Sequence, residues 1–117
     1  MVSPAELVAD AHKEGRLDGA FVEQAAQGGQ RDVVTAALAQ LARVDEQTVK
    51  RILSAGSAKP VVSLVWHAHL SMRVAFKIQT FIMKLPTRDI LPARGGVGFP
   101  LTKEEMRWHL NYFNINA

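Results

Sequence analysis

The feature that most constrains this chain is a short pattern that occurs three times at nearly equal spacing. Each copy has an apolar residue, then Asp or Ser, two variable residues, and two apolar or small residues. The copies are LDGAFV at 17–22, VDEQTV at 44–49 and LSMRVA at 70–75, so they begin 27 and 26 residues apart. The Asp or Ser is suited to cap a helix N-terminus, and the apolar residue before it is placed to pack four positions into that helix. The pattern therefore predicts three capped helix starts, at Asp18, Asp45 and Ser71.

Helical periodicity fills the segments before these starts. Val33, Val34, Ala37 and Leu38, for example, fall on one apolar face. Glycines stand where helices of this kind end: Gly15, Gly28, Gly29 and Gly56. No segment alternates between apolar and polar residues with a period of two, so strands are not expected. We predict seven helices, at about 4–14, 19–27, 31–42, 46–55, 59–68, 72–85 and 103–113.

The first six helices pair into three helical hairpins. This indicates an all-α fold in which the hairpins stack as a small bundle or a solenoid-like repeat. The length of 117 residues suits a single domain over 1–117. No apolar run approaches the roughly 20 residues of a membrane helix, and the polar, acidic N-terminus is unlike a signal peptide. We therefore expect a cytoplasmic protein that does not enter a membrane.

The charge is unevenly distributed along the chain. Residues 1–46 carry four basic and eight acidic side chains, a net −4. Residues 47–103 carry nine basic side chains and one acidic, a net +8, and the remainder carries −1. A segment of +8 attracts anionic partners, such as a nucleic acid, an acidic protein surface, or the acidic N-terminal half of a second copy.

The predicted helix 72–85 carries much of this positive charge. Arg73, Lys77 and Lys84 follow the spacing i, i+4 and i+11, which aligns them along one side of a helix. The opposite side is expected to be buried, and it consists of Val74, Ile78, Phe81, Ile82 and Leu85. With Arg88 and Arg94, the three aligned cations form the predicted partner-binding or anion-binding set.

Segment 59–85 also has the spacing of a helix-turn-helix, in which Met72, Arg73 and Lys77 would approach bases or phosphates. The same cap pattern begins the helices near 18 and 45, however, where the flanking charges are acidic or mixed. A signature shared by all three hairpins is better explained as architecture. The leading interpretation is therefore a non-enzymatic interaction or regulatory module that binds an acidic protein partner or associates with itself. Nucleic-acid binding is the alternative.

The glycine-rich stretch RGGVG at 94–98 raises the question of a phosphate site. A P-loop needs a Gly-Lys pair, and the sequence contains none. Thr102 and Glu105 form a capping box, so the next helix start is satisfied by its own side chains. We expect a connector, with a small-anion site at Arg94 as the alternative.

No catalytic or metal-binding constellation is evident. His67 and His69 are two residues apart on a helix, so their side chains diverge and do not share a metal ion. Ser63 is four residues before His67 but lacks an orienting acid. The absence of cysteine excludes thiolate catalysis, cysteine metal sites and disulfides. We therefore expect no enzymatic activity, no cofactor and no metal.

Aromatic residues on two helices suggest contact surfaces. In the last helix, Met106 and Leu110 line one side, whereas Trp108 and Tyr112 line another. The second stripe needs cover from the preceding loop or from a partner. Phe76 similarly falls outside the main buried face of its helix. Phe76, Trp108 and Tyr112 are the interface candidates.

Three phrases together resemble a bacterial family, domain-of-unknown-function family 2336. They are EGRLDGAFVEQAAQGGQRDVVTAALAQLA (14–42), KPVVSLVWHAHLSMRVAFKIQ (59–79) and ILPARGGVGFPLTKEEMRWHL (90–110). The similarity covers most of 14–113 and is to the C-terminal part of the family's longer proteins, which suggests that the chain is a piece of one. The resemblance implies an all-helical, repeat-like fold without an established activity. At position 69, where members commonly have glycine, this chain has His69, which tolerates a left-handed backbone less well.

Overall fold

The computed structural model describes residues 2–117, and within this range the chain forms seven α-helices and no strand. The helices are α1 (Pro4–Lys13), α2 (Gly19–Gln27), α3 (Arg31–Ala42), α4 (Glu46–Ser54), α5 (Ala58–His67), α6 (Met72–Lys77) and α7 (Lys103–Tyr112). A π-helix, η1 (Ile78–Ile82), continues α6, and a short 3-10 helix, η2 (Thr87–Asp89), follows it. The predicted all-α class and the number of helices are confirmed.

Side chains cap most of the predicted helix starts. The Asp18 carboxylate accepts from the Phe21 N–H at 2.9 Å, and Asp45 accepts from the Thr48 N–H at 2.7 Å. The predicted capping box of α7 is present, since Thr102 and Glu105 bond reciprocally. The third repeat differs. Ser71 occupies the N-cap position with an extended backbone, but its hydroxyl accepts no capping hydrogen bond, so that part of the prediction is wrong.

Five helices end in the same way. A residue one or two positions after the helix turns into the left-handed region, and the N–H of the residue that follows it bonds to the carbonyl five residues earlier, for example Leu70 N to Val65 O at 3.0 Å. This geometry satisfies carbonyls that the helix leaves free. The left-handed residues are Gly15, Gly29, Arg43, His69 and Asn114. His69, with φ 62°, thus stands at a glycine-favouring C′ position, as predicted.

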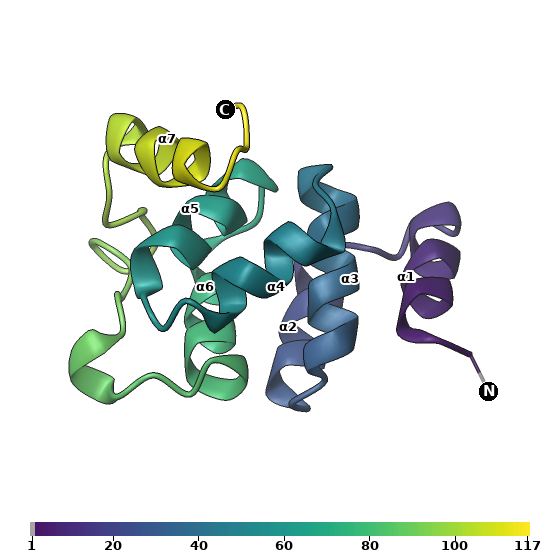
Figure 1. Cartoon of the computed structure of the whole chain (residues 1–117). Helices are drawn as coiled ribbons and strands as arrows, with labels where there is room; N and C mark the ends of the chain where they lie inside the picture. Colours follow the sequence, from purple (N-terminus) through teal and green to yellow (C-terminus); the bar gives the residue numbers. More distant parts are fainter. Residues whose placement is uncertain (1) are drawn as a thin grey trace.

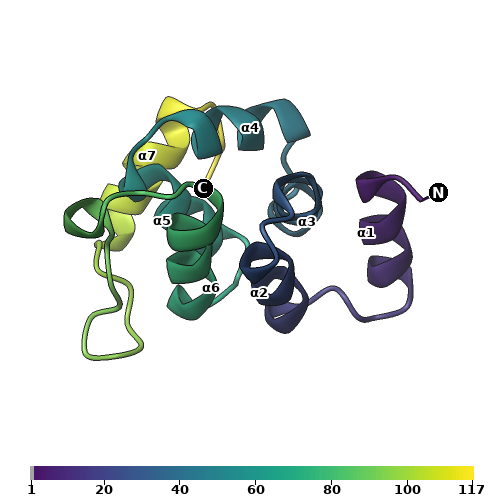
Figure 2. The same ribbon diagram turned by 90° about the horizontal axis from the view of Figure 1, so that it is seen from below.

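The odd-numbered helices form one row across the molecule. Helix α3 packs between α1 and α5, and α5 packs between α3 and α7. Figure 1 shows α1 at one end, with α7 and the glycine loop at the other. The second arms of the hairpins are not in one layer. Helix α2 packs against α6 on one side of the row, whereas α4 lies on the other side of α3 (Figure 2). This alternation distinguishes the fold from a regular solenoid.

The core lies along this row and is built from aliphatic side chains. Leu38, Ile52, Leu64 and Ile78 are fully buried, and each comes from a different helical segment. The apolar residues before the repeated caps, Leu17, Val44 and Leu70, are partly buried against this core. None of the helices in residues 2–117 combines the length and apolar character that crossing a bilayer requires.

The predicted continuous helix over 72–85 is wrong at its second half. The Met83 N–H bonds to Ile78 O at 2.9 Å, a π-type spacing, and Lys84 is left-handed with φ 52°. The extra residue in the π-turn rotates the following side chains about the helix axis. Phe81, predicted on the buried side, is accordingly 41% exposed, and Gln79, one turn after the buried Ala75, is fully buried.

Candidate functional site

A groove between α6 and the glycine loop brings together residues from three of the predicted sites. It has a volume of about 380 Å³ and is mainly apolar. Its lining consists of Met72, Arg73, Phe76, Lys77, Pro92, Ala93 and Gly96. The predicted cations Arg73 and Lys77, the interface candidate Phe76 and the glycine loop therefore share one concave surface.

The two cations of the groove share an acidic partner on α2. Arg73 Nε donates to Glu23 Oε1 at 2.7 Å, and Lys77 Nζ lies 3.7 Å from the same oxygen. The Arg73 side chain remains 75% exposed, whereas Lys77 and Glu23 are 21% and 18% exposed. Lys77 is therefore largely covered, although it belongs to the predicted cationic side of the helix. Arg73 is paired but accessible, so it remains able to meet a ligand.

The opposite wall of the groove is fixed by a buried glutamine. Gln79 Nε2 donates to Leu91 O at 3.1 Å, and Gln79 Oε1 accepts from the Leu91 N–H at 2.8 Å. Both polar ends of a buried amide are thus satisfied by one backbone unit. The contact ties the loop beside Pro92 to η1. Gln79 was not predicted as a functional residue; its signal is a lone amide within a mostly apolar helical segment.

The glycine loop is a tight turn closed by its own backbone. Arg94 and Gly98 exchange two hydrogen bonds, Arg94 N to Gly98 O at 2.7 Å and Gly98 N to Arg94 O at 2.8 Å. Gly95 and Gly96 between them have φ of 60° and 89°, values that glycine adopts without strain. The N–H groups of Arg94 and Gly98 are therefore engaged within the loop. Val97 at its tip is 84% exposed.

The remaining predicted cations lie outside the groove lining. Lys84, Arg88 and Arg94 are all exposed, but they belong to the segments that follow η1. Since the helix ends before Lys84, this residue does not extend the stripe of Arg73 and Lys77, and that prediction is wrong. The predicted set of five cations is thus divided into two in the groove and three on the surrounding connections.

The other interface candidates form an exposed aromatic pair on α7. Trp108 is 64% and Tyr112 72% exposed, and their rings stack with centroids 6.2 Å apart. The preceding loop does not cover them. A shallow hollow of about 280 Å³ beside them is lined by Glu104, Glu105, Trp108 and His109.

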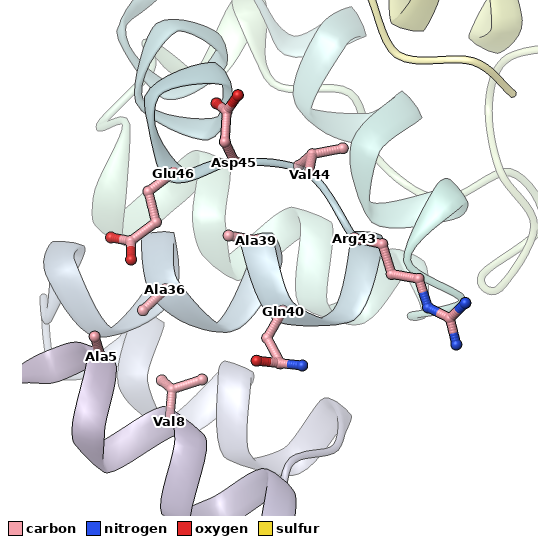
Figure 3. Close-up of a pocket in the computed structure, with 9 residues that line it drawn as sticks. All are labelled: Ala5, Val8, Ala36, Ala39, Gln40, Arg43, Val44, Asp45 and Glu46. Atoms are coloured by element: carbon pink, nitrogen blue, oxygen red, sulfur yellow. The ribbon is translucent and has the colours of Figure 1, made fainter.

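A second groove, which the sequence did not predict, lies between α1, α3 and the start of α4. Small apolar side chains from α1 and α3 form its floor. Glu46 extends toward the space between these two helices (Figure 3). Arg43 and Asp45 point away from it in the same view. The residues around it are Ala5, Val8, Ala36, Ala39, Gln40, Arg43, Val44, Asp45 and Glu46. With a single carboxylate directed inward, it offers no converging set of groups for chemistry.

The candidate nucleophile and histidines are not assembled into a site. Ser63 is fully buried, and its hydroxyl donates to Lys59 O at 2.7 Å instead of to His67. Burial lowers the pKa of His67, and the charge of His69 lowers it further. Burial also lowers the pKa of His109, with Lys59 adding to the effect and Glu105 opposing it. Across residues 2–117, no three side chains of the metal-binding types come together.

Comparison with known proteins identifies one family. Residues 2–95 match the model of domain-of-unknown-function family 2336, which is described as an uncharacterised protein conserved in bacteria. The matched residues contain α1 to α6, η1 and η2, and they end at Gly95 in the glycine loop, before α7 begins. Neither the curated proteins nor the solved structures yield a match.

Proposed function

This chain belongs to bacterial domain-of-unknown-function family 2336, and from that premise we propose that it is a non-enzymatic interaction module whose α6 groove binds an acidic segment of a protein. The observation that carries the proposal is the concave surface formed by α6 and residues 92–96, in which two cations and an aromatic side chain are adjacent. We also propose that the module acts in the cytoplasm.

The groove has the two kinds of contact that a short peptide segment needs. Phe76, which is 43% exposed, forms with Pro92 and Ala93 an apolar surface for one anchoring side chain. Arg73 lies beside this surface, and its guanidinium has donors beyond the one bonded to Glu23. A ligand with a carboxylate next to an apolar residue would use both features at once.

The shape of the surface favours a protein over a nucleic acid. A helix that reads DNA projects into a groove about 12 Å wide, so it needs a convex, accessible face. Here the outward side of α6 is flanked by the loop at 92–96, and Glu23 on α2 offsets part of its positive charge. These features weaken the electrostatic attraction that supplies most non-specific DNA binding.

Selection from a random peptide display library would test the proposal. We expect enriched peptides to be acidic and to contain an aromatic or aliphatic anchor. Their affinity, measured by calorimetry, should fall at least about tenfold in Arg73→Glu and in Phe76→Ala, a loss of about 1.4 kcal/mol. Lys50→Glu on the exposed face of α4 makes the same charge change elsewhere and should leave the affinity unchanged.

Binding to a duplex DNA of about 30 base pairs provides the competing measurement. Tight binding at about 50 mM salt, with a steep loss as salt rises, would replace the proposal with nucleic-acid recognition. Enrichment of basic peptides, or equal binding by Arg73→Glu and the wild-type chain, would also contradict it.

A further inference from the structure

We propose that the ligand of the α6 groove is helix α7 of a second copy of this chain. The inference rests on the proposed function, since it names an occupant for the same groove. It begins from the exposed side of α7, which carries two large aromatic residues that no part of the chain within residues 2–117 covers. Aromatic side chains left open to solvent in this way commonly mark contact surfaces.

The exposed side of α7 has the composition that the groove requires. Glu104, Trp108 and Tyr112 follow one another at intervals of four residues, so they lie on one face of the helix. The Glu104 carboxylate makes no ion pair or side-chain hydrogen bond among the described residues, whereas Glu105 is engaged in the capping box. The face therefore presents a free carboxylate one turn before a stacked aromatic pair.

The charges of the two surfaces are complementary. The groove contributes Arg73 and Lys77 beside an apolar wall of Phe76, Pro92 and Ala93. The helix contributes Glu104 beside Trp108. An indole ring against the apolar wall would bring Glu104 toward Arg73, whose guanidinium is accessible. The contact thus pairs an aromatic anchor with an ion pair at its edge, an arrangement that gives interfaces both affinity and orientation.

Helix α7 is already folded and packed on its own chain before any contact with a second copy. Met106 and Leu110, on its other side, are buried, and α7 packs on α5. The stacked rings of Trp108 and Tyr112 are also held against each other before any partner arrives. Docking therefore requires no unfolding of α7, which reduces the entropy lost on association.

Because the groove and the helix are different surfaces, the contact between copies is heterologous. Each copy offers one groove and one helix, so association leads to a ring or an open chain of copies. This property provides a sharp test with two variants. Arg73→Glu impairs the groove and leaves the helix face intact, whereas the double variant Trp108→Ala/Tyr112→Ala impairs the helix face and leaves the groove intact.

Analytical ultracentrifugation at low salt measures the outcome. We expect the wild-type chain to associate with rising concentration, and each variant alone to remain monomeric. An equal mixture of the two should give a dimer and nothing larger, because one intact groove meets one intact helix. Leu7→Ala, which removes an apolar side chain 39% exposed on α1, is the matched control and should associate like the wild-type chain. Circular dichroism establishes that each variant is folded.

Several results would overturn the inference. The wild-type chain could stay monomeric up to about 1 mM, which would mean a dissociation constant above that concentration. If the aromatic double variant also binds the selected acidic peptides normally, the inference fails and the proposed function stands. If the double variant still associates and Arg73→Glu does not, the occupant is another acidic surface, such as that of α1. If neither association nor peptide binding depends on Arg73, both proposals fail.

Discussion

Gln79 determines, as a single residue, where the wall of the groove lies. Its buried amide bonds to both backbone groups of Leu91, and within residues 2–117 no other side chain makes this connection. Gln79→Leu leaves an N–H and a C=O without partners in a partly buried place, so we expect the free energy of unfolding to fall by about 2–3 kcal/mol. Urea denaturation measures the change, and peptide binding should weaken with it because the loop is released.

Gln47→Leu on the exposed surface of α4 is the control for this substitution. It exchanges the same residue types without disturbing a hydrogen bond, so its effect should stay within about 0.5 kcal/mol. Equal stability of the two variants would show that water replaces the amide and that Gln79 does not support the loop.

His69 offers a prediction of the opposite sign. Its φ of 62° places a side chain in the left-handed region, which costs an L-residue roughly 1–2 kcal/mol and glycine almost nothing. His69→Gly should therefore raise the free energy of unfolding by about 0.5–1 kcal/mol, after allowance for the greater freedom of glycine in the unfolded chain. His12→Gly, inside the right-handed helix α1, should instead lower it by up to about 1 kcal/mol. A loss of stability in His69→Gly would mean that the imidazole makes a contact of its own.

Among the elements, α4 begins at a cap whose strength depends on pH. Hydrogen bonds from the backbone N–H and side chain of Thr48 hold the pKa of the Asp45 carboxyl below its ordinary value. A lowered folded-state pKa means that this stabilisation is complete above about pH 4 and is lost as the pH falls further. Asp45→Asn keeps a capping group but does not titrate, so the fall in Tm between pH 6 and pH 2.5 should be smaller than in the wild-type chain.

Asp45→Ala separates the two effects, because it removes the cap at every pH. Its Tm should already be lower at pH 6, and its fall on acidification should resemble that of Asp45→Asn. A wild-type pH dependence in both variants would assign the acid sensitivity to other carboxylates.

The helical elements were predictable because local signals define them. Caps such as Asp18 and stops such as Gly15 act within one turn, so the order and number of helices follow from short stretches. The break in α6 was not predictable in this way. Its apolar residues suit a regular helix, and no glycine or proline stands near Ile78 to signal a break. The π-turn includes Gln79, whose amide bonds to Leu91, 12 positions away in the sequence.

For the molecule as a whole, contacts between residues far apart in the sequence again limit what could be predicted. The sequence indicated Arg73 and Lys77 as partner-binding residues and Phe76 as a separate interface candidate, and the fold places all three in one groove. Glu23 could not have been foreseen, because it lies 50 residues from Arg73 in the sequence, and α2 meets α6 only through the alternating arrangement of the hairpins. The loop wall depends on the same long-range packing.

This long-range pair leads to a prediction about competition within the molecule. The Glu23 carboxylate pairs with the Arg73 guanidinium as a ligand carboxylate would. Glu23→Gln removes this charge and should leave the guanidinium available to a ligand. Glu23 is mostly buried and also pairs with the largely covered Lys77, so stability should fall by roughly 1–3 kcal/mol. The affinity for an acidic peptide should rise by up to about tenfold at low salt. The gain should fade near 1 M salt, where screening shortens the reach of charge to about 3 Å. Calorimetry at both salt concentrations measures it. A weaker affinity in Glu23→Gln would show that Glu23 orients Arg73 toward the ligand, and that the carboxylate belongs to the binding site as a positioning group.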